Sequence, residues 1–272
     1  MRFLGLIVAL LIGVGPALSG EKTADEIIAE NGCPRCKLVL ASLRFLDLDD
    51  ADFSRATLRE ADLKEANLPR LQCTRCDLQR AELEKAVLSD ATFGRSRMRG
   101  VDLEKAVMNG VDFHEADLRD ADLSSGNLIA ANLSHADLRH ALLRRSDLSG
   151  ADLSHSMSRS ANMERAVAEG ANFSNAELEL VDLDRARLAG ASFREADMSH
   201  VRLTSSDLTG ADLSGATLEG ALLRRTNFSS ANLSGVRGLT QEQLNLACGN
   251  SATIVPDGFS LPQCPETMLP DD

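Results

Sequence analysis

The segment ADLSSGNLIAANLSHADLRHALLRRSDLSGADLSH, residues 121–155, places a leucine at the centre of each of seven successive five-residue blocks. An α-helix needs apolar residues with a period near 3.6, and a half-buried strand needs a period of two. Apolar residues with a period of five line one face of neither a helix nor a strand. The chain is therefore expected to turn after every block.

The same pattern extends far beyond this segment on both sides. If the central residue of a block is position i, the centres run in steps of five from Leu38 to Leu233 without an insertion or deletion. Leu, Phe or Met holds 37 of the 40 centres, and a small residue holds position i−2 in 38 blocks. Because i−2 and i point to the same side of an extended segment, each block supplies one small and one large side chain to a narrow axis. Stacked coils then cover one another, so the sequence predicts a solenoid.

The blocks follow the pattern A-[D/N]-[L/F]-x-x, as in Ala51-Asp52-Phe53, Ala61-Asp62-Leu63 and Ala211-Asp212-Leu213. This pattern resembles the pentapeptide repeat family over residues 33–238. The resemblance implies an all-β fold, a right-handed quadrilateral β-helix of four blocks per coil. Forty blocks would make about ten coils, or a rod of roughly 48 Å at strand-like spacing.

Two columns of residues independently indicate a coil of 20 residues. Five phenylalanines at block centres are separated by multiples of 20, and five glycines at position i+2 share another such column, where a turn needs a positive φ. The phenylalanines are Phe53, Phe93, Phe113, Phe173 and Phe193, and the glycines are Gly110, Gly150, Gly170, Gly190 and Gly210.

The chain divides into four segments. Residues 1–19 have a basic start, an apolar stretch and small residues before Gly20, which is typical of a secretory signal peptide. We therefore expect an exported protein, periplasmic or extracellular, that does not insert into a membrane after signal cleavage. Residues 20–32 form an N-terminal cap, residues 33–238 the repeat, and residues 239–272 a C-terminal helix and tail.

Both ends of the repeat carry helix-start signals. Thr23 to Glu26 and Thr240 to Gln243 each fit a capping box. We expect Ile27 and Ile28 to cover the first coil, and Leu244 and Leu246 to cover the last, because an open β-edge invites aggregation.

Six cysteines form three pairs with separate interpretations. Cys248 and Cys264 flank the tail, and a disulfide between them is the leading expectation in an oxidising compartment. Cys33, Cys36, Cys73 and Cys76 are candidates for disulfides or buried thiols. A four-thiolate zinc site and a C-x-x-C redox centre are the alternatives, but two pairs 40 residues apart would lie two coils from each other, about 10 Å.

No residues are expected to be catalytic, to ligate a metal or to bind a cofactor. The chain has no Trp or Tyr, and it contains no phosphate-binding loop, Ser-His-Asp order or zinc-hydrolase motif. His135 and His155 share a column with Glu115, which leaves a surface metal site as an alternative to a solvated column.

Two outward surfaces are candidates for partner binding. The arginine row, one residue per coil at position i+1, is the candidate binding face, and a face rich in small and apolar residues is the candidate packing face. The row comprises Arg99, Arg119, Arg139 and Arg159, and the packing face includes Val87, Val107, Ile129 and Ala130. Flanking acids Asp117 and Asp137 compete for the row, so a self-neutralised surface is the alternative.

The function predicted from these patterns is a non-enzymatic exported scaffold for protein interactions. Its partner is an unknown protein or a polyanionic polymer, a homodimer is one option, and nucleic acid is not expected because the net charge is −12. The resemblance also implies an alternative, an acidic rod that mimics DNA and binds DNA gyrase. A thiol-based redox or zinc-binding protein is the third interpretation.

Overall fold

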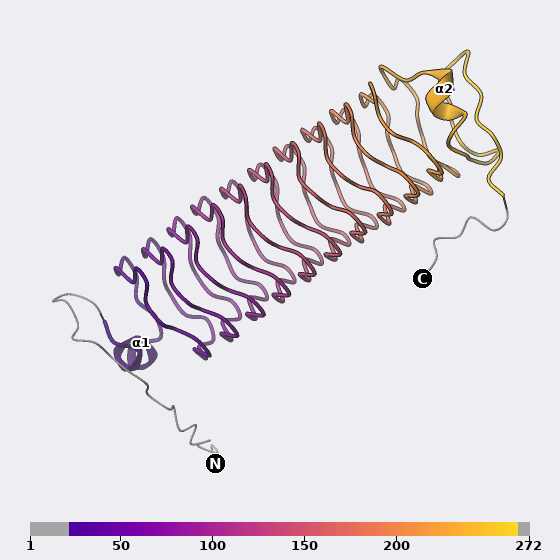
Figure 1. Ribbon diagram of the computed structural model, residues 1–272. Coiled ribbons are helices and arrows are strands. Elements are labelled where there is room, and N and C mark those ends of the chain that lie inside the picture. Colours follow the sequence, from indigo (N-terminus) through magenta and orange to yellow (C-terminus); the bar gives the residue numbers. More distant parts are fainter. Residues whose placement is uncertain (1–21, 266–272) are drawn as a thin grey trace.

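The computed structural model describes residues 22–265, and the predicted signal peptide, residues 1–19, lies outside the described residues. The described chain is a rod of coils stacked along one axis, with one short helix at each end (Figure 1). Helix α1 spans Ala24–Glu30 and helix α2 spans Gln241–Leu244.

Parallel β-bridges join each coil to the next. They link residues 20 positions apart throughout the repeat, from Gly32↔Asp52 to Thr217↔Arg237, so each coil has four blocks and four sides. Only position i−1 of a block forms a bridge, and the described residues contain no longer strand. The expected β-helix therefore consists of isolated bridges, because a turn on either side of each block leaves no room to extend the pairing.

The block around Leu123 shows why the repeat favours Asp or Asn before the central leucine. The backbone N–H of Leu123 donates to Leu142 O (2.7 Å), and that of Ser125 donates to Arg144 O (2.8 Å), both in the next coil. The N–H of Ser124 points to no carbonyl. It donates instead to Oδ1 of Asp122 (2.9 Å). The side chain at i−1 thus satisfies the backbone donor that the corner would otherwise leave without a partner.

The corner needs a positive φ at position i+2. Gly110 and Gly210 meet this requirement with φ of 66° and 69°, as the glycine column predicts. Most corners nevertheless carry other residues there, such as Arg55 with φ of 63°. The left-handed conformation costs a non-glycine residue about 1–2 kcal/mol, so the stacked coils hold these corners against a local preference.

Positions i−2 and i fill the interior of the rod. The five phenylalanines of the predicted column are all buried, and the rings of Phe93 and Phe113 stack at 5.4 Å, as those of Phe173 and Phe193 do at 4.9 Å. Buried serines at i−2 donate to nearby carbonyls, as Ser146 Oγ does to Leu143 O (2.8 Å). Within residues 22–265, these side chains form one packed core along the axis of the rod.

Each end is covered, although by fewer residues than expected. Both capping boxes form, and Ile27 and Leu244 are fully buried. The expectation for Ile28 and Leu246 is wrong, since both are more than half exposed. Helix α1 turns only Ile27 toward the first coil, and Leu246 lies beyond the end of α2. Gln243 also covers this end with a polar side chain. Its Nε2 donates hydrogen bonds to two backbone carbonyls of the last regular coil, Leu218 O (3.1 Å) and Ala221 O (2.9 Å).

Candidate interaction surfaces

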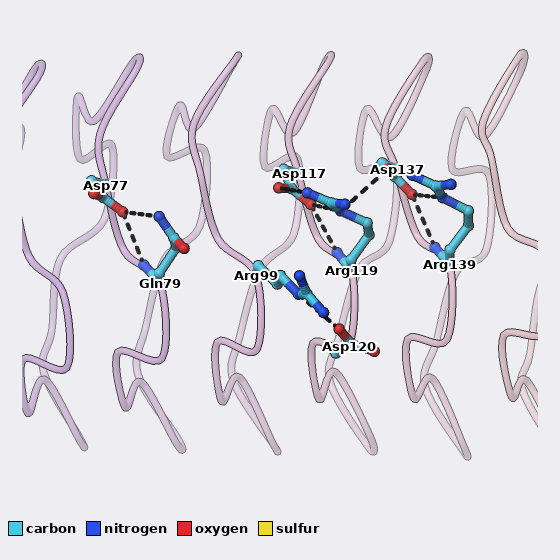
Figure 2. Close-up of polar contacts among 8 residues, drawn as sticks. All are labelled: Asp77, Gln79, Arg99, Asp117, Arg119, Asp120, Asp137 and Arg139. Atoms are coloured by element: carbon cyan, nitrogen blue, oxygen red, sulfur yellow. Dashed lines mark hydrogen bonds and ion pairs between the residues drawn. The ribbon is translucent and has the colours of Figure 1, made fainter.

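The arginine row lies along one side of the rod, and each of its members has a carboxylate partner. Arg119 binds Asp117 through Nε and Nη2, both at 2.7 Å, and Arg139 binds Asp137 in the same way at 2.8 and 2.6 Å (Figure 2). Arg99 Nε donates to Asp120 (2.9 Å) and Arg159 Nη2 donates to Glu179 (3.1 Å). The row therefore presents guanidinium groups that are already neutralised.

The two central pairs have perturbed proton affinities. The hydrogen bond from the Arg119 side chain holds the pKa of Asp117 below its usual range, and the bond to Asp117 raises the pKa of Arg119. Asp137 raises the pKa of Arg139 in the same way. Asp117 and Asp137 also accept the backbone N–H at i+1, so they occupy a fixed corner position from which they hold the arginines.

The candidate packing face is small and interrupted. Val87 and Val107 pair in one bridge and are half-buried, whereas Ile129 and Ala130 are exposed. Further along the same side, Arg187 Nη2 donates to Glu169 (2.6 Å). The next bridges of this column join Val107 to Asn127 and Asn127 to Asp147, so polar residues interrupt the apolar surface in the middle coils too. The use of this face as a dimer seam stays a prediction.

The structure joins all six cysteines in three disulfides. Cys33–Cys36 and Cys73–Cys76 each close one corner turn, with Cα atoms 5.6 and 5.4 Å apart. The Cys248–Cys264 disulfide (Cα–Cα 4.7 Å) joins the tail to the end of the rod, where Cys248 itself forms a β-bridge with Asn227. These bonds leave no free thiol among the described residues for the zinc or redox alternatives.

The histidine column is a stack of rings. His135 and His155 lie face to face with centroids 4.9 Å apart, and His114 meets His135 edge-on at 5.5 Å. Glu115 is engaged by Arg95 Nε (2.8 Å). Within residues 22–265, no group of three or more His, Cys, Asp or Glu side chains is arranged to hold a metal ion.

A second row of arginines was not singled out from the sequence. Arg35, Arg55, Arg75 and Arg95 occupy position i+2 of one corner in four successive coils, beside an open depression whose lining includes Ser54, Thr74 and Gly94. The signal was present in the sequence as a 20-residue spacing and as the repeated motif Cys-x-Arg-Cys.

Neither described helix has the length and apolar character needed to cross a bilayer.

Comparison with known proteins identifies the repeat. The family model for pentapeptide repeats matches in 8 copies, over residues 36–70, 58–94, 70–104, 86–125, 127–157, 161–199, 171–210 and 206–237. No enzyme family is indicated by these matches. No curated protein matches the chain.

Solved structures of similar proteins include three pentapeptide repeat or resistance proteins. HetL, a pentapeptide repeat protein involved in heterocyst differentiation regulation from the cyanobacterium Nostoc sp. strain PCC 7120, is 28% identical, with 85% of this chain and 97% of HetL covered and a TM-score of 0.36. QnrB1, a plasmid-mediated fluoroquinolone resistance protein, is 16% identical, with 77% and 94% covered and a TM-score of 0.34. A pentapeptide repeat protein from the thylakoid lumen of Arabidopsis thaliana is 32% identical, with 36% and 68% covered and a TM-score of 0.21.

Proposed function

Because the chain belongs to the pentapeptide repeat family, we propose that it is a non-enzymatic, exported scaffold whose partner docks on one long side of the rod. The family also implies that the coil is right-handed. The partner is a protein or a polyanionic polymer that meets several coils at once.

The observation that carries this proposal is the straightness of the outward columns. Residues at a given position recur one coil apart, about 4.8 Å, along a rigid bridged axis. A partner that matches this spacing makes the same contact several times, and the rod loses little conformational entropy because its side is preformed. Affinity then comes from repetition along one side and requires no enclosed pocket.

Export is supported by two features of the chain. Residues 1–19 fit a secretory signal, and the cysteines pair as disulfides, which persist in oxidising compartments. Mass spectrometry of protein recovered from its native cell tests export directly. A mature chain that starts near Gly20 supports it, and an intact Met1 with free thiols overturns it.

Photo-cross-linking from each side of one coil tests the docking mode. A photoreactive amino acid replaces Arg119, Ser124, Ile129 or His135, one outward position on each of the four sides, in four otherwise identical exported proteins. A side-docking partner should be captured from one or two adjacent positions only. Equal capture from all four, or capture only from a fifth variant labelled at Leu246 on the C-terminal cap, contradicts the proposal.

Purified DNA gyrase serves as the counter-probe. If gyrase binds the rod and duplex DNA competes for that binding, the DNA-mimicking alternative replaces the scaffold proposal.

A further inference from the structure

At one corner, three successive coils each present an arginine that has no ion pair within residues 22–265: Arg35, Arg55 and Arg75. These three side chains lie at position i+2, are exposed, and have φ of 62°, 63° and 59°. Among residues 22–265, none of the three has an ion pair or a side-chain hydrogen bond, whereas the next member, Arg95, is bound by Glu115 (2.8 Å). We call Arg35, Arg55 and Arg75 the basic corner.

The surroundings of the basic corner add positive charge. Lys37 and Arg59 lie in the following blocks and also lack an ion pair within the described part of the chain. The nearby acid Asp77 is buried and is bound by Arg97 Nη2 (2.7 Å).

Two carboxylates also lie at this corner: Asp52 accepts the backbone N–H of Ser54 (2.8 Å), and Asp112, which lines the depression, accepts a hydrogen bond from Asn132 Nδ2 (2.9 Å). Neither forms an ion pair with Arg35, Arg55 or Arg75, so these three guanidinium groups have no bound carboxylate on a protein whose net charge is −12.

Two disulfides hold the basic corner in place. Cys33–Cys36 brackets the turn that presents Arg35, and Cys73–Cys76 brackets the turn that presents Arg75, two coils away. Arg55 lies between them. A cross-link over a turn restricts the corner that places each guanidinium, so less order has to be imposed on binding. Among the four corners that present Arg35, Arg55, Arg75 and Arg95, only those of Arg35 and Arg75 carry a disulfide.

Neutral hydrogen-bonding groups accompany the cations. Ser54 and Thr74 lie in the open depression beside Arg55 and Arg75, and their hydroxyl groups have no hydrogen bond to the described residues. Guanidinium and hydroxyl donors together suit carboxylate or phosphate oxygens. The chain contains no Trp or Tyr on which a nucleobase could stack. His114, the aromatic ring that lines the depression, is hydrogen-bonded to Ser134 (2.9 Å).

The dimensions favour a short ligand. Glu115 follows Arg95 in the same column, and Glu60 lies across the adjoining side, so a long polyanion would run into negative charge. The Cβ atoms of residues three or four positions apart on an α-helix are about 5–6 Å from each other. This spacing is close to the coil spacing of about 4.8 Å.

Resting on the proposed scaffold function, we infer that the basic corner binds an acidic α-helical segment of a partner protein. Arg35, Arg55 and Arg75 each pair with one carboxylate on successive turns of that helix. Ser54 and Thr74 donate to the same carboxylates or to their neighbours.

The probe is a synthetic α-helical peptide with Glu at every fourth position, titrated into the full mature protein at low salt. The test variant reverses all three charges, Arg35→Glu, Arg55→Glu and Arg75→Glu. The control reverses Arg145, Arg185 and Arg225, which are also exposed i+2 arginines without an ion pair in residues 22–265, but which lie two coils apart. Both variants change the net charge equally.

We expect the dissociation constant for the peptide to rise at least about tenfold in the test variant and less than about twofold in the control. An equal rise in both variants means nonspecific attraction and overturns the inference. The inference is also overturned if duplex DNA or a sulfated oligosaccharide binds more tightly than the peptide and the test variant abolishes that binding. The basic corner would then take a different class of ligand. A peptide with the same composition but scrambled spacing should bind more weakly, and equal binding contradicts the match to the helix.

Failure here is separable from failure of the scaffold proposal. If the peptide does not bind while photo-cross-linking still captures a partner from one side of the rod, only the basic corner is wrongly assigned.

Discussion

Arg119 and Asp117 form a closed pair: the guanidinium donates twice to the carboxylate, at 2.7 Å each, and the same carboxylate accepts the backbone N–H of Arg119. The residue that shapes the corner thus also neutralises the cation that the corner presents. A partner that uses the arginine row has to displace or share this carboxylate, whereas a partner at Arg35 or Arg55 does not.

Asp117 should give a pH-dependent contribution to stability. Its pKa is depressed in the folded state, so its contribution is present above the pKa of the unfolded chain, about 3.9, and is lost as the pH falls through the folded pKa. The difference in unfolding free energy between the wild type and Asp117→Asn should therefore shrink on acidification from pH 7 to pH 2. A difference that stays constant over this range would show that Arg119 does not stabilise the charged form.

The inward phase of the repeat is tested at Leu138, which is fully buried. Leu138→Ala should lower the free energy of unfolding by about 2–5 kcal/mol, because it leaves a cavity in a packed core. Ser154→Ala, at a half-buried outward position whose hydroxyl has no hydrogen bond to the described residues, should cost less than about 0.5 kcal/mol. Denaturant titration measures both, and equal losses would refute the assigned phase.

The acceptor role of the i−1 side chain is tested at Asp122. Asp122→Ala leaves the N–H of Ser124 without its partner and should cost about 1 kcal/mol. Asp122→Asn keeps an Oδ1 acceptor and should retain most of the stability. If the two variants were equally destabilised, charge rather than the hydrogen bond would explain the preference for Asp at this position.

The tail disulfide should protect the C-terminal edge. Cys248→Ser with Cys264→Ser should release the tail from the last coil and expose unpaired backbone groups, which favours self-association. Sedimentation velocity should then detect oligomers that the wild type lacks. The control is Cys73→Ser with Cys76→Ser, which leaves both ends of the rod covered. This variant should form no more oligomers than the wild type.

The sequence predicts the features that repeat and misses those that depend on a single contact. The centres from Leu38 to Leu233 and the phenylalanine column fix the phase and the 20-residue coil, because burial depends on periodicity alone. The exposure of Ile28 could not be predicted, since it depends on how a seven-residue helix is rotated on the first coil.

Outward positions show the same limit. Ser134 lies at the outward position i+1 of its block, yet it is buried, because its hydroxyl lies between Asn132 Oδ1 (2.6 Å) and His114 Nδ1 (2.9 Å). The arginine row and its flanking acids Asp117 and Asp137 could be predicted from the sequence, but the geometry shows which carboxylate each arginine binds. It adds two partners that the spacing did not indicate, Asp120 for Arg99 and Glu179 for Arg159. Spacing places side chains next to one another and does not determine which pairs form.

The most direct test of the central claim, that a partner docks on one side of the rod, compares capture by three charge variants of the exported protein. The first variant carries Arg119→Glu and Arg139→Glu, the second carries Ile129→Arg, and the third carries the reversals at Arg35, Arg55 and Arg75. Capture of the cross-linked partner is quantified for each, with dimerisation measured in parallel by sedimentation equilibrium. The account predicts that capture is lost with one of the arginine variants while Ile129→Arg affects dimerisation alone. Unchanged capture and unchanged association in all three variants would contradict docking on any of these surfaces.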